Sequence, residues 1–279
     1  MHPVLGHRHT TGARRSAAGC GRHRQGLPDR SAARGCRPSD RRRFRPCGPP
    51  LGAAPVTGFS QTAWRAVADW FTAITTHPFL QQLADGTLPE PVFARYLLDD
   101  AHYLTGYSAA LATLAARSTD HGARVMLARS AAGALEAEGQ LHRGYLLPRG
   151  VDPDAPDAAE PTPTCVAYVD GLRATAFAEP PGVGMAAVLP CFRVYAEVGR
   201  WIIGQAVPDP HPYRAWIKTY ADPAFAEAVR MAEAYTDRLA DAAGDQERDA
   251  MLAAYVRSTR FEWMFWDAAW RGESWPTAR

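Results

Sequence analysis

Apolar residues recur every three or four positions through most of the chain after Gly58, which is the repeat of an amphipathic α-helix. The first stripe of this kind consists of Phe59, Ala63, Val67, Trp70 and Ile74. No stretch of convincing length alternates apolar and polar residues as a half-buried β-strand would. The pattern therefore predicts an all-α helical bundle from residue 58 onward.

Proline and glycine mark the ends of the predicted helices. A first helix around residues 59–74 is followed by stops at His77-Pro78 and at Asp85-Gly86. The segment Pro148–Pro163 contains five prolines, so we expect a surface loop there. The remaining helices are predicted at residues 89–117, 121–147, 164–178, 182–205, 211–220, 223–243 and 246–271.

The first 57 residues differ from the rest of the chain in composition. They contain 12 Arg, no Lys and two acidic residues, a net charge of +10, whereas residues 58–279 carry a net charge of −8. They are rich in Gly, Pro, Arg and Ser, and without an apolar repeat they cannot bury enough surface to offset the entropy cost of ordering. We predict a disordered extension at 1–57 ahead of a folded helical domain at 58–279.

Three functions for this extension each match only part of the required pattern. A transit peptide would be Arg-rich, but the many Pro and Gly residues spoil an amphipathic helix. A nucleic-acid-binding tail would need more than the short basic cluster that begins at Arg41. A zinc site from Cys20, Cys36 and Cys47 lacks the usual paired spacing. We expect a dispensable extension, or a start codon assigned too far upstream, and no nucleic-acid partner.

Our expectation for the cellular location of the protein rests on sequence features that are absent. It has no charge-free apolar run of about 18 residues, so no membrane span is expected. No apolar segment near Met1 indicates a secretory signal. Residues 58–279 contain only Cys165 and Cys191, which argues against a disulfide framework and fits a reducing cytoplasm.

Cys191 lies inside the apolar helical run Leu189–Gly199. Pro190 lacks the N–H that a helix interior needs, so we expect the helix to bend where Cys191 stands. Tyr195 follows one turn later on the same face. A buried structural cysteine is the commoner outcome for a free thiol. A nucleophile that faces a cavity is the alternative.

Asp100 interrupts the apolar stripe of the helix at 89–117, with Tyr103 beside it. A carboxylate on a core face costs several kcal/mol unless it is paired or hydrogen-bonded. It is therefore either half of an ion pair with an arginine or a cavity group that binds a polar ligand. We expect Asp99, on another face, to be solvated.

Glu262 is the only charged residue on the stripe of the last helix, among Phe261, Trp263 and Trp266. Loss of water there is expected to raise its pKa toward the range of general acid–base catalysis. A hydrogen-bonded structural glutamate is the alternative. Glu138 and His142, four residues apart, could hold a metal. Because few other histidines follow, we expect no metal and a Glu–His pair that fixes two helices.

Seven short segments of the folded part carry a resemblance to a known protein family, in which they follow one another in the same order. They are His77-Pro78-Phe79, Asp85-Gly86-Thr87-Leu88-Pro89, Phe93-x-x-Tyr96-Leu97-Leu98-x-Asp100-x-x-Tyr103-Leu104, Glu136-x-Glu138-x-x-x-His142, Leu189-Pro190-Cys191-x-x-x-Tyr195-x-Glu197-Val198-Gly199, Trp216-Ile217-x-x-Tyr220 and Glu262-x-x-Phe265-Trp266. With them, residues 59–275 resemble the TenA family, the thiaminase II group of the haem-oxygenase-like superfamily.

The resemblance implies an aminopyrimidine aminohydrolase that converts 4-amino-5-aminomethyl-2-methylpyrimidine, and in some members thiamin, to the 5-hydroxymethyl compound. It implies Cys191 as the nucleophile at ring carbon C6, Asp100 as the group that holds the amidine edge, and Glu262 as the group that moves protons. The residues that match the family's pocket tyrosines are Tyr103, Tyr168, Tyr195 and Tyr220. It also implies a homotetramer and no cofactor.

Two positions depart from the family pattern. His102 stands where many members have tyrosine, and Arg193 lies two residues after Cys191, so we expect either to alter the rim of the pocket. Two other functions stay open. One is an oxidative enzyme of the same superfamily, di-iron or similar to pyrroloquinoline quinone synthase. The other is a non-catalytic pyrimidine-binding relative.

Overall fold

The computed structural model describes residues 58–152, 160–205 and 208–277, except the side chains of residues 137, 138 and 140. The predicted disordered extension, residues 1–57, lies outside the described residues. Within them the chain forms α-helices and a short 3₁₀ turn at Leu147–Arg149, and no strand. The helices are α1 (Phe59–Ala66), α2 (Ala68–Thr75), α3 (Pro78–Asp85), α4 (Glu90–Arg117), α5 (His121–Leu146), α6 (Pro163–Ala178), α7 (Pro181–Ile203), α8 (Arg214–Tyr220), α9 (Pro223–Ala242) and α10 (Asp245–Arg271).

Several of the helix ends predicted from the sequence are confirmed by residues that cap the helices. His77 caps α3, because its Nδ1 accepts the N–H of Phe79 at 3.1 Å, and Pro78 starts the helix. Gly86 ends α3 with φ +80°, a left-handed conformation that suits glycine. Asp120, Thr162 and Asp222 cap α5, α6 and α9 in the same manner as His77.

Two predicted boundaries are wrong. The single helix around 59–74 is broken at Val67, whose N–H bonds to the carbonyl of Trp64 rather than to that of Ala63. Val67 remains fully buried, so the apolar stripe continues across the break. The helix predicted from His211 begins at Arg214, because His211 closes a turn by accepting the N–H of Tyr213 on its Nδ1.

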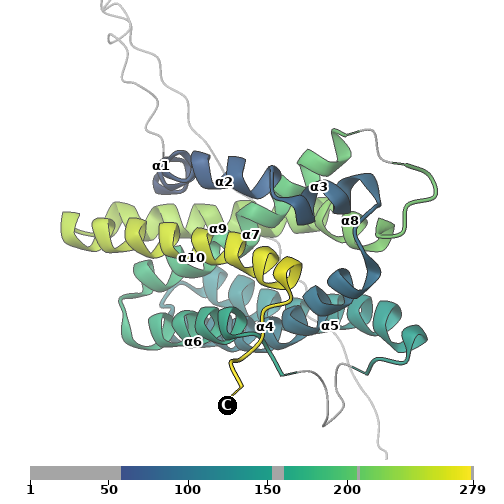
Figure 1. Cartoon of the computed structure of the whole chain (residues 1–279). Helices are drawn as coiled ribbons and strands as arrows, with labels where there is room; N and C mark the ends of the chain where they lie inside the picture. The colour runs from purple at the N-terminus through teal and green to yellow at the C-terminus, as the bar shows by residue number, and fades with distance from the viewer. Residues whose placement is uncertain (1–57, 153–159, 206–207, 278–279) are drawn as a thin grey trace, which may run out of the picture. The chain divides into compact units, whose positions relative to one another are not determined.

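The helices pack in layers (Figure 1). α4 lies along α5 and α6, while α7 lies along α9 and α10. α1–α3 cross α9 and α10 on the side away from α4–α6. A Cβ at Gly199 of α7 would stand 2.9 Å from the carbonyl oxygen of Tyr220, so a glycine there allows the close approach of α8. This approach places Tyr220 beside α7.

α7 continues as an α-helix through Pro190. The bend at this residue stays a prediction. Among the described residues no helix combines the length and the apolar character needed to cross a membrane.

Candidate active site

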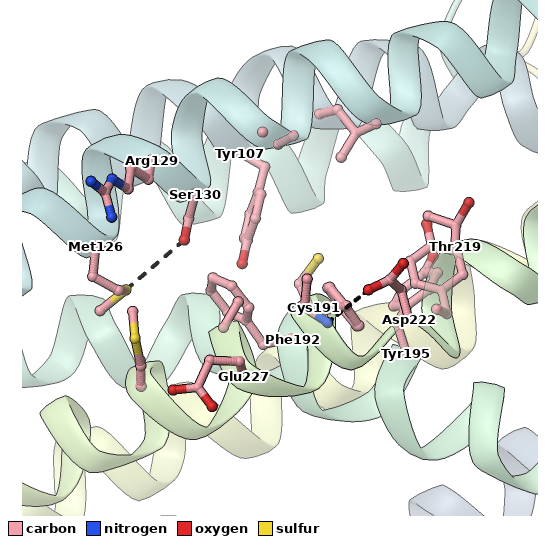
Figure 2. A pocket seen from close by; sticks show the side chains of 18 of the residues that line it. Tyr107, Met126, Arg129, Ser130, Cys191, Phe192, Tyr195, Thr219, Asp222 and Glu227 are labelled. Atoms are coloured by element: carbon pink, nitrogen blue, oxygen red, sulfur yellow. Dashed lines mark hydrogen bonds between the residues drawn. The ribbon is translucent and has the colours of Figure 1, made fainter.

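A cavity of about 770 Å³ lies between α4, α5, α7, α8 and α9 (Figure 2). Five of the seven predicted site residues line it: Asp100, Tyr103, Cys191, Tyr195 and Tyr220. The other two, Tyr168 and Glu262, do not line it and lie buried behind Tyr103. Helices far apart in the sequence thus bring most of the predicted site to one cavity.

Cys191 is half-buried, whereas its neighbour Phe192 is almost completely buried. Figure 2 shows its sulfur pointing away from α7 into the space between the helices. Tyr107 of α4 approaches it from across the cavity, and its hydroxyl donates a hydrogen bond to the carbonyl of Val188 at 3.1 Å. Burial raises the pKa of Tyr107, and the adjacent Cys191 raises it further. Cys191 therefore faces the cavity, as a nucleophile must.

Asp100 is paired with a histidine rather than with an arginine. Its Oδ2 lies 2.8 Å from Nε2 of His142 on α5, and both side chains are buried. The hydrogen bond compensates for the burial of the carboxylate and fixes its orientation at the cavity wall. His142 was expected to pair with Glu138, whose side chain lies outside the described residues.

Glu262 is 1% exposed and accepts a hydrogen bond from the hydroxyl of Tyr168 at 2.6 Å. Burial raises the pKa of Glu262 to about 8, the Tyr168 hydrogen bond opposes this rise, and the charge of Asp100 adds to it. The expected rise in pKa is confirmed. A carboxyl group in this range can donate a proton at neutral pH and take one back.

Aromatic rings connect these groups. Tyr103 stacks on Tyr107 with ring centroids 5.5 Å apart and contacts Tyr168 at 5.0 Å. Tyr195 contacts Tyr220 at 4.7 Å. Tyr103 is thus the side chain that links the cavity to the buried pair of Tyr168 and Glu262. Such rings provide flat faces for a heterocycle and hydroxyls at its edge.

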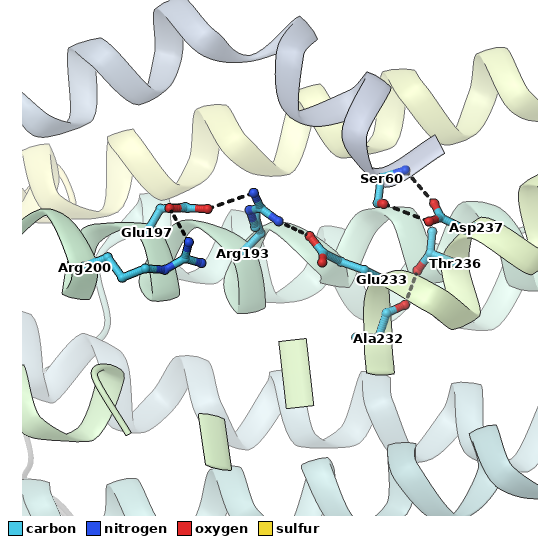
Figure 3. Close-up of polar contacts among 8 residues, drawn as sticks. All are labelled: Ser60, Arg193, Glu197, Arg200, Ala232, Glu233, Thr236 and Asp237. Carbon is cyan, nitrogen blue, oxygen red and sulfur yellow. Dashed lines mark hydrogen bonds and ion pairs between the residues drawn. The ribbon is translucent and has the colours of Figure 1, made fainter. Parts of the chain in front are cut away.

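Three expectations from the sequence are wrong. Asp99 is not solvated: it is 2% exposed and accepts hydrogen bonds from the N–H and hydroxyl of Thr162 at 2.9 and 3.0 Å. The segment before α6 covers it, and burial raises its pKa. His102 is exposed, and neither it nor Arg193 lines the cavity. Arg193 instead lies between Glu197 and Glu233 on the outer side of α7 (Figure 3).

Sequence reasoning missed several residues that line the cavity. Tyr107, which lies on the same apolar stripe as Asp100, was given no role, although an aromatic hydroxyl on a core face was a signal. The lining residues from α5 and α9, which include Met126, Gly133, Phe225 and Met231, follow from packing and carried no local signal. Among the described residues, no group of three or more His, Cys, Asp or Glu side chains is placed to hold a metal ion.

Residues 64–272 match the profile of the TENA/THI-4/PQQC family. The chain belongs to this family. It is 33% identical over 219 residues to the aminopyrimidine aminohydrolase of Bacillus subtilis, an alignment that covers 78% of this chain and 92% of that protein. It is 36% identical over 217 residues to the thiamine biosynthesis multifunctional protein ThiED of Corynebacterium glutamicum, covering 78% of this chain. The match spans only 27% of ThiED.

Solved structures share the fold of this TENA/THI-4/PQQC family member. A TenA homologue from P. horikoshii OT3 superposes with a TM-score of 0.69 and 28% identity, covering 77% of this chain and all of that one. A domain of unknown function from Shewanella denitrificans, described as heme oxygenase-like, superposes with a TM-score of 0.60 and 15% identity, covering 78% and 94%. The predicted haem-oxygenase-like, all-α fold is confirmed.

Proposed function

We propose that this protein is an aminopyrimidine aminohydrolase of the thiaminase II type. Its substrate would be 4-amino-5-aminomethyl-2-methylpyrimidine, and its products the 5-hydroxymethylpyrimidine and ammonia. The observation that carries the proposal is the convergence of Asp100, Cys191 and four tyrosines on one cavity, with Glu262 buried behind Tyr103 and Tyr168. The aminopyrimidine aminohydrolase name of the Bacillus subtilis relative supports the same reaction.

Substrate binding begins with the amidine edge of the pyrimidine. A ring nitrogen and the adjacent exocyclic amine match the two oxygens of a carboxylate, and Asp100 provides these oxygens at the cavity wall. His142 holds Asp100 from behind, so the carboxylate is oriented before the substrate arrives. The rings of Tyr103, Tyr195 and Tyr220 enclose the flat heterocycle.

The reaction then uses Cys191. A protonated aminopyrimidine held by Asp100 is electrophilic at C6, and the thiolate of Cys191 forms a bond to that carbon. The enamine so formed expels the amine from the methylene group on C5. The broken C–N bond leaves its electron pair on nitrogen, which takes a proton that originates from Glu262.

Water completes the cycle. The ionised Glu262 accepts a proton as water bonds to the exocyclic methylene carbon, and the restored enamine expels the thiolate from C6. The ring becomes aromatic again, and Cys191 and Glu262 return to their starting states. Because Glu262 does not line the cavity, we infer that its protons pass through the hydroxyls of Tyr168 and Tyr103. The scheme needs no cofactor or metal.

Turnover by the reduced full-length protein tests the proposal. The aminopyrimidine is incubated with wild type, with Cys191→Ser and with Cys165→Ser as the matched control, since Cys165 is a buried thiol that does not line the cavity. Wild type and Cys165→Ser should release the hydroxymethyl product, detected by mass spectrometry, and Cys191→Ser should not. A folded wild-type protein that releases no product would contradict the proposal.

The homotetramer stays a prediction. Light scattering of the purified protein tests it by measuring the molar mass in solution.

A further inference from the structure

The segment that follows α10 connects this helix to α4 and α6. Gly272 ends α10 in a left-handed conformation with φ +63°, and the N–H of Glu273 turns back to donate to the carbonyl of Ala268 at 2.9 Å. Glu273 is therefore a fixed extension of the helix that carries Glu262. In Figure 1 the chain continues from the end of α10 past α4 and α6.

Glu273 contacts α4 and α6 at the same time. Its Oε2 accepts the N–H of Thr164, in the first turn of α6, at 3.0 Å. A carboxylate at this position also complements the positive end of the helix dipole. The backbone carbonyl of Glu273 accepts a hydrogen bond from the guanidinium of Arg95 of α4 at 2.6 Å. The indole N–H of Trp275 donates to the carbonyl of Pro161 at 2.9 Å, so the segment holds the start of α6 against α4.

Asp99 of α4 makes a second attachment to the start of α6. Its carboxylate oxygens accept the N–H and the hydroxyl of Thr162, the residue that caps α6. Its backbone carbonyl accepts a hydrogen bond from the thiol of Cys165 at 3.3 Å. The ends of three helices thus meet in one set of contacts, which we call the helix junction. It consists of Arg95, Asp99, Thr162, Thr164 and Glu273.

The helix junction lies close to groups that the proposed reaction uses. Asp100 directly follows Asp99 on α4. Tyr168 follows Thr164 by four residues, about one turn of α6. The hydroxyl of Tyr168 in turn donates to Glu262 of α10 at 2.6 Å. A small shift of α6 against α10 would lengthen this bond, and a misplacement of about 1 Å can cost about 10²-fold in rate.

We propose that Glu273 is a positioning residue for the reaction. Its bonds to Thr164 and Arg95 fix the start of α6 relative to α4 and α10, and this keeps the Tyr168 hydroxyl on Glu262. The inference rests on the proposed function. Because Glu273 does not line the cavity, its effect passes through Tyr168 rather than through contact with the substrate.

Three variants separate this role from a general effect on stability. Glu273→Ala removes the acceptor of the Thr164 N–H. Glu273→Gln keeps a side-chain oxygen that can accept the same N–H, so it should restore the function. Glu179→Ala is the matched control, because Glu179 is an exposed glutamate at the opposite end of α6.

Steady-state kinetics with the aminopyrimidine should show a change in kcat rather than in KM. In Glu273→Ala kcat should fall about tenfold, the effect of one lost hydrogen bond at the upper end of the usual range. KM should change little, because Asp100 and the tyrosines that enclose the ring keep their places. The alkaline limb of the kcat profile should move to higher pH, since the Tyr168 hydrogen bond that lowers the pKa of Glu262 is weakened. Glu273→Gln and Glu179→Ala should resemble wild type.

Urea unfolding provides a measurement that needs no substrate. Burial raises the pKa of Glu262 to about 8, the Tyr168 hydrogen bond opposes this rise, and the charge of Asp100 adds to it. Above about pH 8 the folded and the unfolded wild type have both lost this proton, so Glu262 no longer makes stability depend on pH. In Glu273→Ala the fall in stability should continue to higher pH, and in Glu179→Ala it should not.

A kcat equal to wild type in Glu273→Ala would overturn the inference. A reduced kcat with neither the alkaline limb nor the unfolding profile shifted would overturn it as well, because a merely structural role gives that result. Should Glu273→Ala not fold, Glu273→Asp keeps the charge and withdraws the oxygen from Thr164 by one methylene, and the same outcomes decide. Failure of wild type to hydrolyse the aminopyrimidine overturns the proposed function instead, and the unfolding profiles then still decide whether Glu273 acts on Tyr168.

Discussion

The imidazole of His142 and the carboxylate of Asp100 form a buried hydrogen bond of 2.8 Å between α5 and α4. Only Asp100 of the two lines the cavity. His142 thus acts from outside the cavity, by limiting the orientations that the carboxylate can adopt.

Removal of His142 should therefore impair catalysis through Asp100. His142→Phe leaves a buried carboxylate without its donor, which costs about 1–3 kcal/mol of stability. Because the carboxylate is then less well aligned with the substrate, we expect KM for the aminopyrimidine to rise. The rise is about tenfold for each 1.4 kcal/mol of substrate-binding free energy that is lost. His142→Gln keeps an N–H donor and should recover part of the loss. Steady-state kinetics and urea unfolding measure both effects, and equal KM values in all three proteins would contradict the positioning role.

Glu262→Gln should lower kcat by about 10²–10⁴-fold, the usual contribution of a general acid–base group. The same variant tests the raised pKa through stability. The pKa of Glu262 rises from 4.5 to about 8 on folding, so between these values the folded chain holds a proton that the unfolded chain has lost. Stability should then fall as pH rises through this window.

Urea unfolding at several pH values measures this dependence. In Glu262→Gln the fall in stability between pH 4.5 and about 8 should be smaller than in wild type, because the titrating group is gone. Asp241→Asn, at an exposed position on α9, serves as a control for the loss of one carboxylate. Identical pH profiles for wild type and Glu262→Gln would contradict the buried, protonated state of this residue.

The general architecture could be predicted from the sequence, and five of the seven predicted site residues line the cavity. Helix repeats are local, so α4 to α10 were located to within a few residues. Asp100 and Glu262 were recognised because a charged residue on an apolar stripe conflicts with its neighbours. The helix break at Val67 could not be predicted, because Val67 stays buried and the apolar stripe of residues 59–74 continues across the break.

Other features depend on contacts that no local pattern contains. The burial of Asp99 follows from Thr162, which lies 63 residues away in the chain. The pairing of Asp100 with His142 depends on the register of α4 against α5. The cavity is lined in part from α5 and α9, whose facing side chains are determined by how the bundle packs.

Tyr168→Phe should change the protonation of Glu262 in a defined direction. The Tyr168 hydroxyl donates to Glu262 and lowers its pKa, so its removal should raise that pKa further. The alkaline limb of the kcat profile should move to higher pH. If protons travel through the two tyrosines, kcat should also fall, and Tyr103→Phe should reduce it similarly. If kcat of Tyr168→Phe had the same value and the same pH dependence as kcat of wild type, both the effect on the pKa of Glu262 and the proton path would be contradicted.

Arg193 should matter for stability and not for chemistry. Its guanidinium lies 2.8 Å from Glu197 and also pairs with Glu233 (Figure 3). It stacks over the ring of Trp64 at 5.0 Å as well. Arg193→Met removes the cation from partly buried Glu233, whereas Glu197 keeps its ion pair with Arg200 at 3.0 Å, and we expect a loss of about 1–3 kcal/mol in the free energy of unfolding. The double variant with Glu233→Gln should lose less than the sum of the single changes. A kcat reduced as strongly as in Cys191→Ser would show that Arg193 serves the reaction after all.

Tyr107→Phe tests how the Cys191 thiol is held. The Tyr107 hydroxyl bonds to the carbonyl of Val188, one turn before Phe192, and lies beside the cysteine. The hydroxyl has a single proton, which it can donate to the Cys191 thiolate in place of the Val188 carbonyl. Its loss should therefore slow alkylation of Cys191 by iodoacetamide about tenfold at pH 7, for a charged hydrogen bond worth about 1.5–3 kcal/mol. Mass spectrometry of the alkylated peptide measures the rate without any substrate. Phenylalanine preserves the ring contact with Tyr103, so the stability of the fold should change by only about 1 kcal/mol. An unchanged alkylation rate would mean that the hydroxyl serves only to bind the carbonyl of α7.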